Sequence, residues 1–106
     1  MSRPSSTAAI SPQALVVGLK AIAESTRLRI LTLLSGGELN VKDLTQILGQ
    51  SQPRISRHLK LLVEAGIVER FREGSWVYFY ISDRSETGRL TLKLLAEVDG
   101  ASAVLR

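Results

Sequence analysis

The chain has 106 residues, 44% of them hydrophobic and 23% charged, which indicates a single globular domain. Its net charge is +4, and residues 51–72 contain five Lys/Arg and two acidic residues. Such a basic patch indicates either a polyanionic partner or a basic face exposed to solvent. The lack of cysteine excludes disulfides and thiolate chemistry. The sequence has no signal-peptide core and no apolar run of the ~18 residues that a membrane span needs, so a cytoplasmic location is expected.

The first half of the sequence predicts three helices after a tail. Residues 1–10 are small and polar and are expected to be disordered. A first helix is expected from Ser11-Pro12 to about Glu24, because serine caps a helix and proline fits its first turn. A second helix is expected from Ser25-Thr26 to Leu34, where Gly36-Gly37 stops it.

The third predicted helix is short. Asn40 can cap it, and Asp43 places a negative charge near the positive end of the helix. Gly49 ends it. Its buried side is expected to consist of Leu44, Ile47 and Leu48.

A fourth helix is predicted within residues 51–66, and only Gln50 separates its cap from the glycine that ends the third. Ser51 is a good N-cap, and Pro53 fits the first turn because a missing N–H costs nothing there. A tight junction between two short helices predicts a helix-turn-helix, a pattern shared by helical hairpins that never touch DNA. An apolar stripe lies opposite a polar face that is basic at its N-terminal end. The stripe is Ile55, Leu59, Leu62 and Val63, and the polar face is Pro53, Ser56, Arg57, Lys60 and Glu64, with Arg54 on one flank.

Past Gly66 the pattern changes to strands and a final helix. Residues 67–73 and 76–81 predict a hairpin, whose five aromatic residues suit packing onto the helices better than stacking on bases. A leucine-rich last helix is expected to begin within residues 83–86 and to complete a domain of residues 11–99. Residues 100–106 are expected to form a C-terminal tail without a closing signal, and one expectation is that the chain is cut from a longer protein. The first and last helices are expected to meet those of a second protomer through Leu15, Leu19, Ile22, Leu90, Leu94, Leu95 and Val98.

Four segments, in their order and spacing, make the sequence resemble the ArsR family of bacterial dimeric repressors over about residues 15–98. They are residues 24–31, 50–62, 64–68 and 72–78. The resemblance implies a mainly α fold with a small β-hairpin (α+β), a winged helix-turn-helix in the order α-α-α-α-β-β-α, dimeric through the first and last helices. It implies a transcriptional regulator, a repressor and not an enzyme, that binds double-stranded DNA at an inverted-repeat operator as a homodimer.

By the same resemblance, the fourth helix and the wing supply the DNA contacts. Gln52 and Arg57 can make two-pronged contacts with base edges, whereas basic side chains farther along suit phosphates. His58 has two interpretations, a half-buried side chain bonded to the neighbouring helix or a contact with the DNA backbone. As the only histidine, it gives no sign of catalysis. The expected contacts are Ser51, Gln52, Ser56, Arg57, His58, Lys60, Arg70 and Arg72, with Arg54 ranked lower.

Metal sensing is not expected. Where many relatives carry a cysteine pair on the third helix, this chain has Asn40 and Lys42, which bind a cation poorly. The last helix has no histidine, and its scattered acids are more typical of a solvated surface; they are Asp83, Glu86, Glu97 and Asp99.

No cofactor is expected, and the release signal is expected to be an organic effector, with the alternative that there is no effector. The run of residues 49–54, Gly-Gln-Ser-Gln-Pro-Arg, is similar to one in regulator modules that precede S-adenosylmethionine-dependent methyltransferase domains. S-adenosylhomocysteine or a related metabolite is the effector that this similarity implies. Two alternatives stay open, a winged-helix module for protein interaction or dimerisation, and the regulatory N-terminal domain of a methyltransferase fusion.

Overall fold

The computed structural model describes residues 9–98, and within them five helices and three strands follow one another in the predicted order, with one added strand. The expected tails lie outside the described residues, apart from Ala9 and Ile10. No helix in the described range is long and apolar enough to cross a membrane. The helices are α1 (Pro12–Ile22), α2 (Ser25–Leu34), α3 (Val41–Leu48), α4 (Gln52–Glu64) and α5 (Glu86–Ala96), and the strands are β1 (Leu39–Asn40), β2 (Val68–Glu73) and β3 (Trp76–Ile81).

Side-chain caps decide where the helices begin. Asn40 and Asp43 form a capping box at α3, in which Asn40 Oδ1 accepts from the Asp43 N–H at 2.8 Å, so the predicted cap is confirmed. Ser51 caps α4 as predicted. α1 ends two residues earlier than expected, because the Glu24 carboxylate caps α2 instead by accepting from the Arg27 N–H at 2.8 Å.

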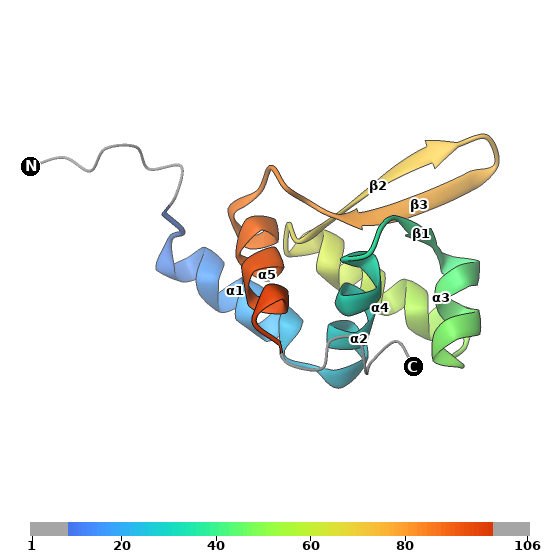
Figure 1. Cartoon of the computed structure of the whole chain (residues 1–106), viewed down its shortest axis with the longest axis horizontal. Coiled ribbons are helices and arrows are strands. Elements are labelled where there is room, and N and C mark those ends of the chain that lie inside the picture. Colours follow the sequence, from blue (N-terminus) through green and yellow to red (C-terminus); the bar gives the residue numbers. More distant parts are fainter. Residues whose placement is uncertain (1–8, 99–106) are drawn as a thin grey trace, which may run out of the picture.

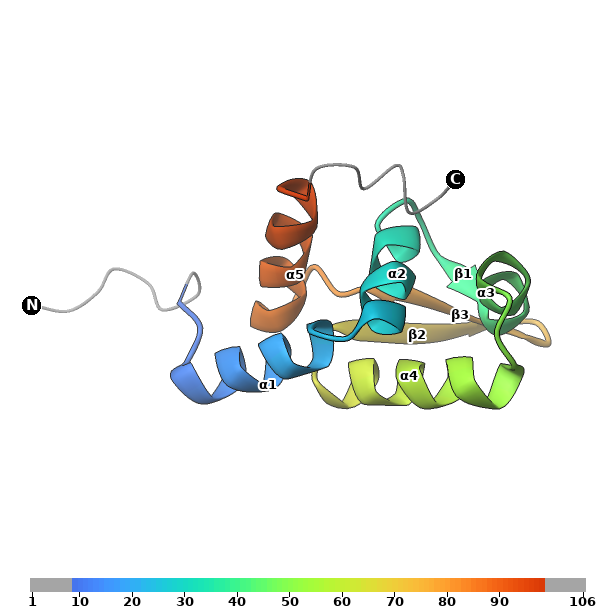
Figure 2. The same cartoon turned by 90° about the horizontal axis from the view of Figure 1, so that it is seen from below.

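The sheet is antiparallel in the order β1-β3-β2, and its added strand β1 pairs Leu39 with Phe79. The hairpin of β2 and β3 extends past the helices toward the α3 end of the molecule, while α1 and α5 lie together at the other end (Figures 1 and 2). Figure 2 shows α4 running along one side of this sheet. The fold thus places α3, the start of α4 and the hairpin tip away from the two terminal helices, while the end of α4 lies beside α1.

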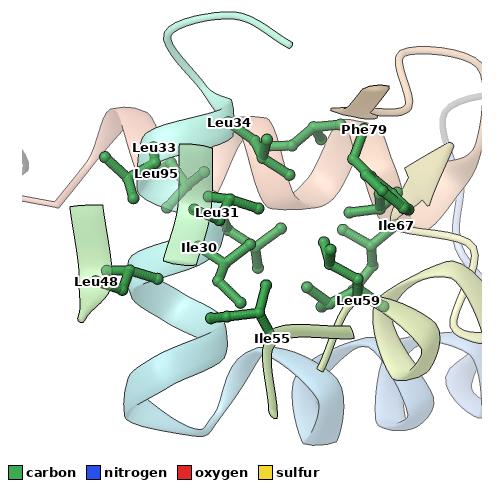
Figure 3. Close-up of a cluster of buried hydrophobic side chains, with 14 residues drawn as sticks. Ile30, Leu31, Leu33, Leu34, Leu48, Ile55, Leu59, Ile67, Phe79 and Leu95 are labelled. Carbon is green, nitrogen blue, oxygen red and sulfur yellow. The ribbon is translucent and has the colours of Figure 1, made fainter. Parts of the chain in front are cut away.

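The hydrophobic core lies between α2, α3, α4 and the hairpin (Figure 3). Ile55 and Leu59 of the predicted α4 stripe are buried in it, together with Ile30 and Leu31 of α2. The expectation that Ile47 is buried is wrong, because this side chain is 50% exposed. In a helix as short as α3, Leu44 and Leu48 are the buried side chains, and Val41 packs half-buried against the core.

The expectation that the aromatic residues pack the hairpin onto the helices holds for Phe79, which is buried. It is wrong for Phe71 and Trp76, which are 37% and 46% exposed. Strand residues alternate between faces, so Phe71 and its partner Tyr78 lie on the face opposite Phe79, where their ring centroids are 5.5 Å apart. The hairpin therefore has one face toward the helices and one aromatic outer face.

Candidate nucleic-acid interface

The turn between α3 and α4 consists of residues 49–51 and is attached to α2. Gly49 adopts a left-handed conformation with φ 66°, which allows the chain to reverse sharply after α3. Gln50 Nε2 donates to Thr26 Oγ1 at 3.1 Å and so attaches the turn to the first turn of α2. The start of α4 is thereby fixed to the scaffold, and sequence reasoning did not assign this role to Gln50.

α4 has the two faces that its sequence predicted. Its apolar side is buried through Ile55, Leu59 and Leu62. Ser56 is half-buried, and its hydroxyl accepts from Gln52 Nε2 at 2.9 Å. The exposed polar side chains on the outer surface include Arg54 and Arg57 close to the helix N-terminus, which itself favours anions, and Lys60 farther along the helix. These exposed residues are Ser51, Gln52, Arg54, Arg57 and Lys60.

Arg70 and Arg72 are exposed on β2 and lie on the helix-facing side of the hairpin. The register shows this, because Arg70 is opposite the buried Phe79 and Arg72 is opposite Val77. Glu69 and the exposed Glu73 lie on the other face. The hairpin therefore separates its cations from its acids, and the cations share a face with the side turned to α4.

His58 lies in the seam between α4 and α2, and its side chain is 19% exposed. Its Nδ1 is 3.3 Å from an Arg27 guanidinium nitrogen and 3.9 Å from Glu24 Oε1. Burial lowers the pKa of His58 from its usual 6.5, the nearby Arg27, Arg57 and Arg54 lower it further, and Glu24 opposes them. These contacts agree with the interpretation of a half-buried histidine that bonds the neighbouring helix.

Arg27 was not singled out by sequence reasoning, although it joins three helices. Its Nε donates to the Ala21 carbonyl at 2.5 Å and its Nη2 to the Lys20 carbonyl at 3.4 Å, which satisfies carbonyls at the end of α1. Its remaining guanidinium nitrogen faces His58 of α4. The spacing from Glu24 to Arg27 at a helix start signals a cap, but not these distant partners.

α1 and α5 cross closely and leave an apolar surface exposed. A methyl group added at Gly18 would lie 3.2 Å from Thr87 Cγ2, so the helices meet where α1 has no side chain. We call the exposed part the terminal-helix surface, defined as Val16, Val17, Leu19, Leu94 and Val98. Of the other residues expected at a protomer contact, Leu15 and Leu90 are half-buried, Ile22 packs against the core, and Leu95 is inside it at 7% exposed.

The segment where metal-sensing relatives carry ligands does not fit a metal ion here. The Asn40 side chain is occupied with capping α3, and Lys42 is exposed and cationic. Across residues 9–98, no group of three or more His, Asp or Glu side chains is placed to hold a metal ion.

Comparison with known proteins gives one consistent class. The model of a family described as "Bacterial regulatory protein, arsR family" matches residues 24–70. Over 64 residues the chain is 52% identical to the arsenical resistance operon repressor of Escherichia coli, a match that covers 59% of this chain and about half (55%) of that protein. Over 63 residues it is 36% identical to the transcriptional repressor SdpR of Bacillus subtilis, covering 59% of this chain and 70% of that one.

Among solved structures, the chain is similar to the homodimeric winged helix-turn-helix DNA-binding domain of Mb0332 from Mycobacterium bovis. The TM-score is 0.71 at 31% identity, and the match covers 91% of this chain and 84% of that one. The winged helix-turn-helix predicted from the sequence is thus confirmed. These three relatives are named as repressors or as a DNA-binding domain, and none of the three is named as an enzyme.

Proposed function

Because this chain belongs to the ArsR family of bacterial regulatory proteins, we propose that it is a DNA-binding transcriptional repressor that acts as a homodimer on an inverted-repeat operator. The observation that carries the proposal is the two-sided α4. Its apolar side is buried, its preceding turn is attached to α2 through Gln50, and its outer side is polar and basic. A helix held in this way can enter a major groove without losing its place on the scaffold.

The proposed contacts divide by chemistry. Gln52 and Arg57 read base edges, because an amide and a guanidinium can each make two hydrogen bonds to one base. Ser51 and the N-terminus of α4 face phosphates, as do the flexible cations, and these contacts set the register on DNA. Ser56 joins the base contacts when Gln52 exchanges their mutual hydrogen bond for one with DNA. The phosphate-facing cations are Arg54, Lys60, Arg70 and Arg72.

His58 supports α4 in this proposal and does not touch DNA, since its ring nitrogen Nδ1 faces Arg27 and Glu24. The homodimer forms through the terminal-helix surface, with Leu15 and Leu90 at its border. Exposed apolar side chains from both terminal helices favour such a contact. The name of the Mb0332 domain as homodimeric supports it as well. Two-fold symmetry then places the half-sites roughly one helical turn, ~10 bp, or a multiple of it apart.

The signal that releases DNA is proposed to be a non-metal small molecule. Asn40 and Lys42 leave no ligand pair at the third-helix position where metal-sensing relatives have theirs. S-adenosylhomocysteine is the first compound to test, in a thermal-shift assay with and without DNA. A compound that binds the free repressor better than the DNA complex raises the melting temperature and weakens DNA binding together, because the two effects are linked.

The central experiment is a gel shift with the DNA upstream of the protein's own gene and a scrambled duplex of equal length. We expect salt-sensitive binding that prefers the upstream DNA. Arg57→Ala and Lys60→Ala should weaken binding while sedimentation still reports dimers. If neither duplex binds, or both bind equally at all salt concentrations, the repressor proposal fails. If DNA binding is absent but dimers persist, the chain is a protein-interaction module instead.

A further inference from the structure

The base of the wing contains a group of polar side chains that the proposed DNA contacts do not use. Glu69, on the outer face of β2, accepts hydrogen bonds from three side chains. The donors are the Tyr80 hydroxyl at 3.1 Å, the Ser82 hydroxyl at 2.5 Å, and the Arg84 guanidinium through Nε at 3.4 Å and through a second contact from Nη2. We call Glu69, Tyr80, Ser82 and Arg84 the wing-base cluster.

The wing-base cluster joins the hairpin to the start of α5. Ser82 is buried, and its hydroxyl accepts from the N–H groups of Arg84 and Ser85 at 3.2 and 3.1 Å. Ser85 caps α5, and its hydroxyl donates to the Gly66 carbonyl at 2.5 Å, just before β2. Glu69 is therefore held by β3 on one side and by the loop into α5 on the other.

β2 depends on such an attachment beyond its pairing with β3. It is one of the two edge strands of the sheet that the described residues form, and β3 is its neighbour there. A two-stranded ribbon is marginally stable and twists easily by itself. A single exposed ion pair contributes little, but Glu69 is only 26% exposed and has three partners from two parts of the chain.

We propose that Glu69 is a positioning residue for the wing, and that it presents Arg70 and Arg72 to DNA phosphates through its bonds to Tyr80, Ser82 and Arg84. Side chains alternate along β2, so holding Glu69 on the outer face sets the direction of Arg70 on the opposite face. Arg72 follows on the same side. The inference rests on the proposed DNA-binding function and assigns a role to residues that touch no DNA themselves.

The direction in which one substitution changes DNA affinity distinguishes a positioning role of Glu69 from a purely electrostatic effect of its charge. Glu69→Gln removes a negative charge from the wing and releases Arg84, so electrostatics alone predicts tighter binding to DNA. Loss of positioning predicts weaker binding. Glu73→Gln is the matched control, because it removes the same charge from the same face of β2 at the distal end, opposite Trp76. Tyr80→Phe is a second variant that removes one donor without changing any charge.

The test measures binding of the full chain to a duplex of about 30 bp, three helical turns, enriched from a random pool by the wild-type protein. We expect Glu69→Gln to bind about tenfold more weakly and to lower the salt slope by roughly two per protomer, as expected for two lost phosphate contacts. Tyr80→Phe should fall between Glu69→Gln and wild type. Glu73→Gln should bind as tightly as wild type or more tightly.

A second readout needs no DNA. Trp76 is the only tryptophan of the chain and lies on the wing, so its fluorescence anisotropy reports motion of the hairpin. We expect lower anisotropy in Glu69→Gln than in Glu73→Gln, with equal helix content by circular dichroism. Should Glu69→Gln fail to fold, the comparison of Tyr80→Phe with wild type decides by the same two measurements.

The outcomes separate the two claims. If the wild-type protein enriches no sequence, the proposed DNA-binding function fails, whatever Trp76 reports. If the wild-type protein binds and Glu69→Gln matches Glu73→Gln in affinity, salt slope and anisotropy, the positioning role of Glu69 is overturned while DNA binding stands. Weaker binding of Glu69→Gln with a wild-type salt slope also overturns it, because the wing contacts would then be intact.

Discussion

Arg27 and His58, 31 residues apart in the sequence, meet across the seam between α2 and α4, with Arg27 Nη1 3.3 Å from His58 Nδ1. A guanidinium has only donors, so His58 Nδ1 accepts this bond and must be unprotonated. Since Arg27 also donates to carbonyls at the end of α1, one side chain connects the proposed dimer helix to the proposed reading helix.

The first prediction concerns pH. The folded protein lowers the pKa of His58 below 6.5, mainly through burial, so the unfolded chain binds more protons in the window below that value. The stability that a neutral His58 provides is therefore present above pH 6.5 and is lost as the pH falls toward the lowered folded pKa. Urea unfolding of wild type and His58→Gln from about pH 8 to about pH 5 tests this. Wild type should lose stability relative to the variant; parallel curves would contradict it.

The second prediction concerns Arg27. Arg27→Gln removes the charge and shortens the side chain, leaving carbonyls at the end of α1 and the His58 ring without their donor. We expect the free energy of unfolding to fall by about 1–3 kcal/mol. Arg29→Gln is the control, because Arg29 is exposed on the same helix and should change stability by less than about 0.5 kcal/mol. Equal effects in denaturant titrations would show that the contacts of Arg27 add nothing.

The third prediction concerns the start of α5. A methyl group at Gly88 would lie 2.0 Å from the Ser82 carbonyl oxygen, so Gly88→Ala must displace α5 or the loop before it. We expect a loss of at least about 3 kcal/mol in calorimetry or chemical unfolding. At Gly36 the nearest atom would be an ordinary 3.5 Å away, and Gly36→Ala should be nearly neutral. A neutral Gly88→Ala would mean that α5 does not approach the loop this closely in solution.

The fourth prediction concerns the proposed dimer. Leu19 and Ile47 are both exposed, but Leu19 belongs to the terminal-helix surface and Ile47 lies on α3 at the other end of the molecule (Figure 2). A buried, unpaired carboxylate is costly, so Leu19→Asp should convert dimers to monomers in sedimentation experiments. Ile47→Asp should leave the mass unchanged. Dissociation by Ile47→Asp, with Leu19→Asp still dimeric, would place the contact elsewhere.

The fifth prediction uses acid. Hydrogen bonds lower the pKa of Glu69 to about 2 from its usual 4.5, and the bond from Arg84 has a larger effect than the bond from Ser82. A lowered carboxyl pKa stabilises the fold above the unfolded value and loses that contribution as the pH falls from 4.5 toward 2. The stability gap between wild type and Glu69→Gln should therefore be constant near neutrality and shrink within that window. A stability gap that stays constant as the pH falls from 4.5 to about 2 would argue against an ionised Glu69 in the cluster.

The sequence alone determined the helix starts and the two faces of α4, because these depend on groups within about four residues of one another. Ser51 capping α4 and the Asn40–Asp43 box are contacts of this kind. The burial of Ile55, Leu59 and Leu62 follows from their helical spacing. The order of elements and the exposed basic side of α4 were therefore predictable.

Only the tertiary structure decided which residues face one another across the fold. β1 has two residues, too few to show any period, and exists because β3, nearly forty positions later, provides partners for its backbone. The sequence left two directions for His58, toward DNA or toward α2, and in the structure its Nδ1 lies 3.3 Å from Arg27 of α2. Glu69 and Arg84 lie 15 residues apart, with the hairpin between them, and no local pattern brings such a pair together. Caps and helical spacing involve residues that are close in the sequence and can be read from it. Pairs that are distant in the sequence meet only when the core packs.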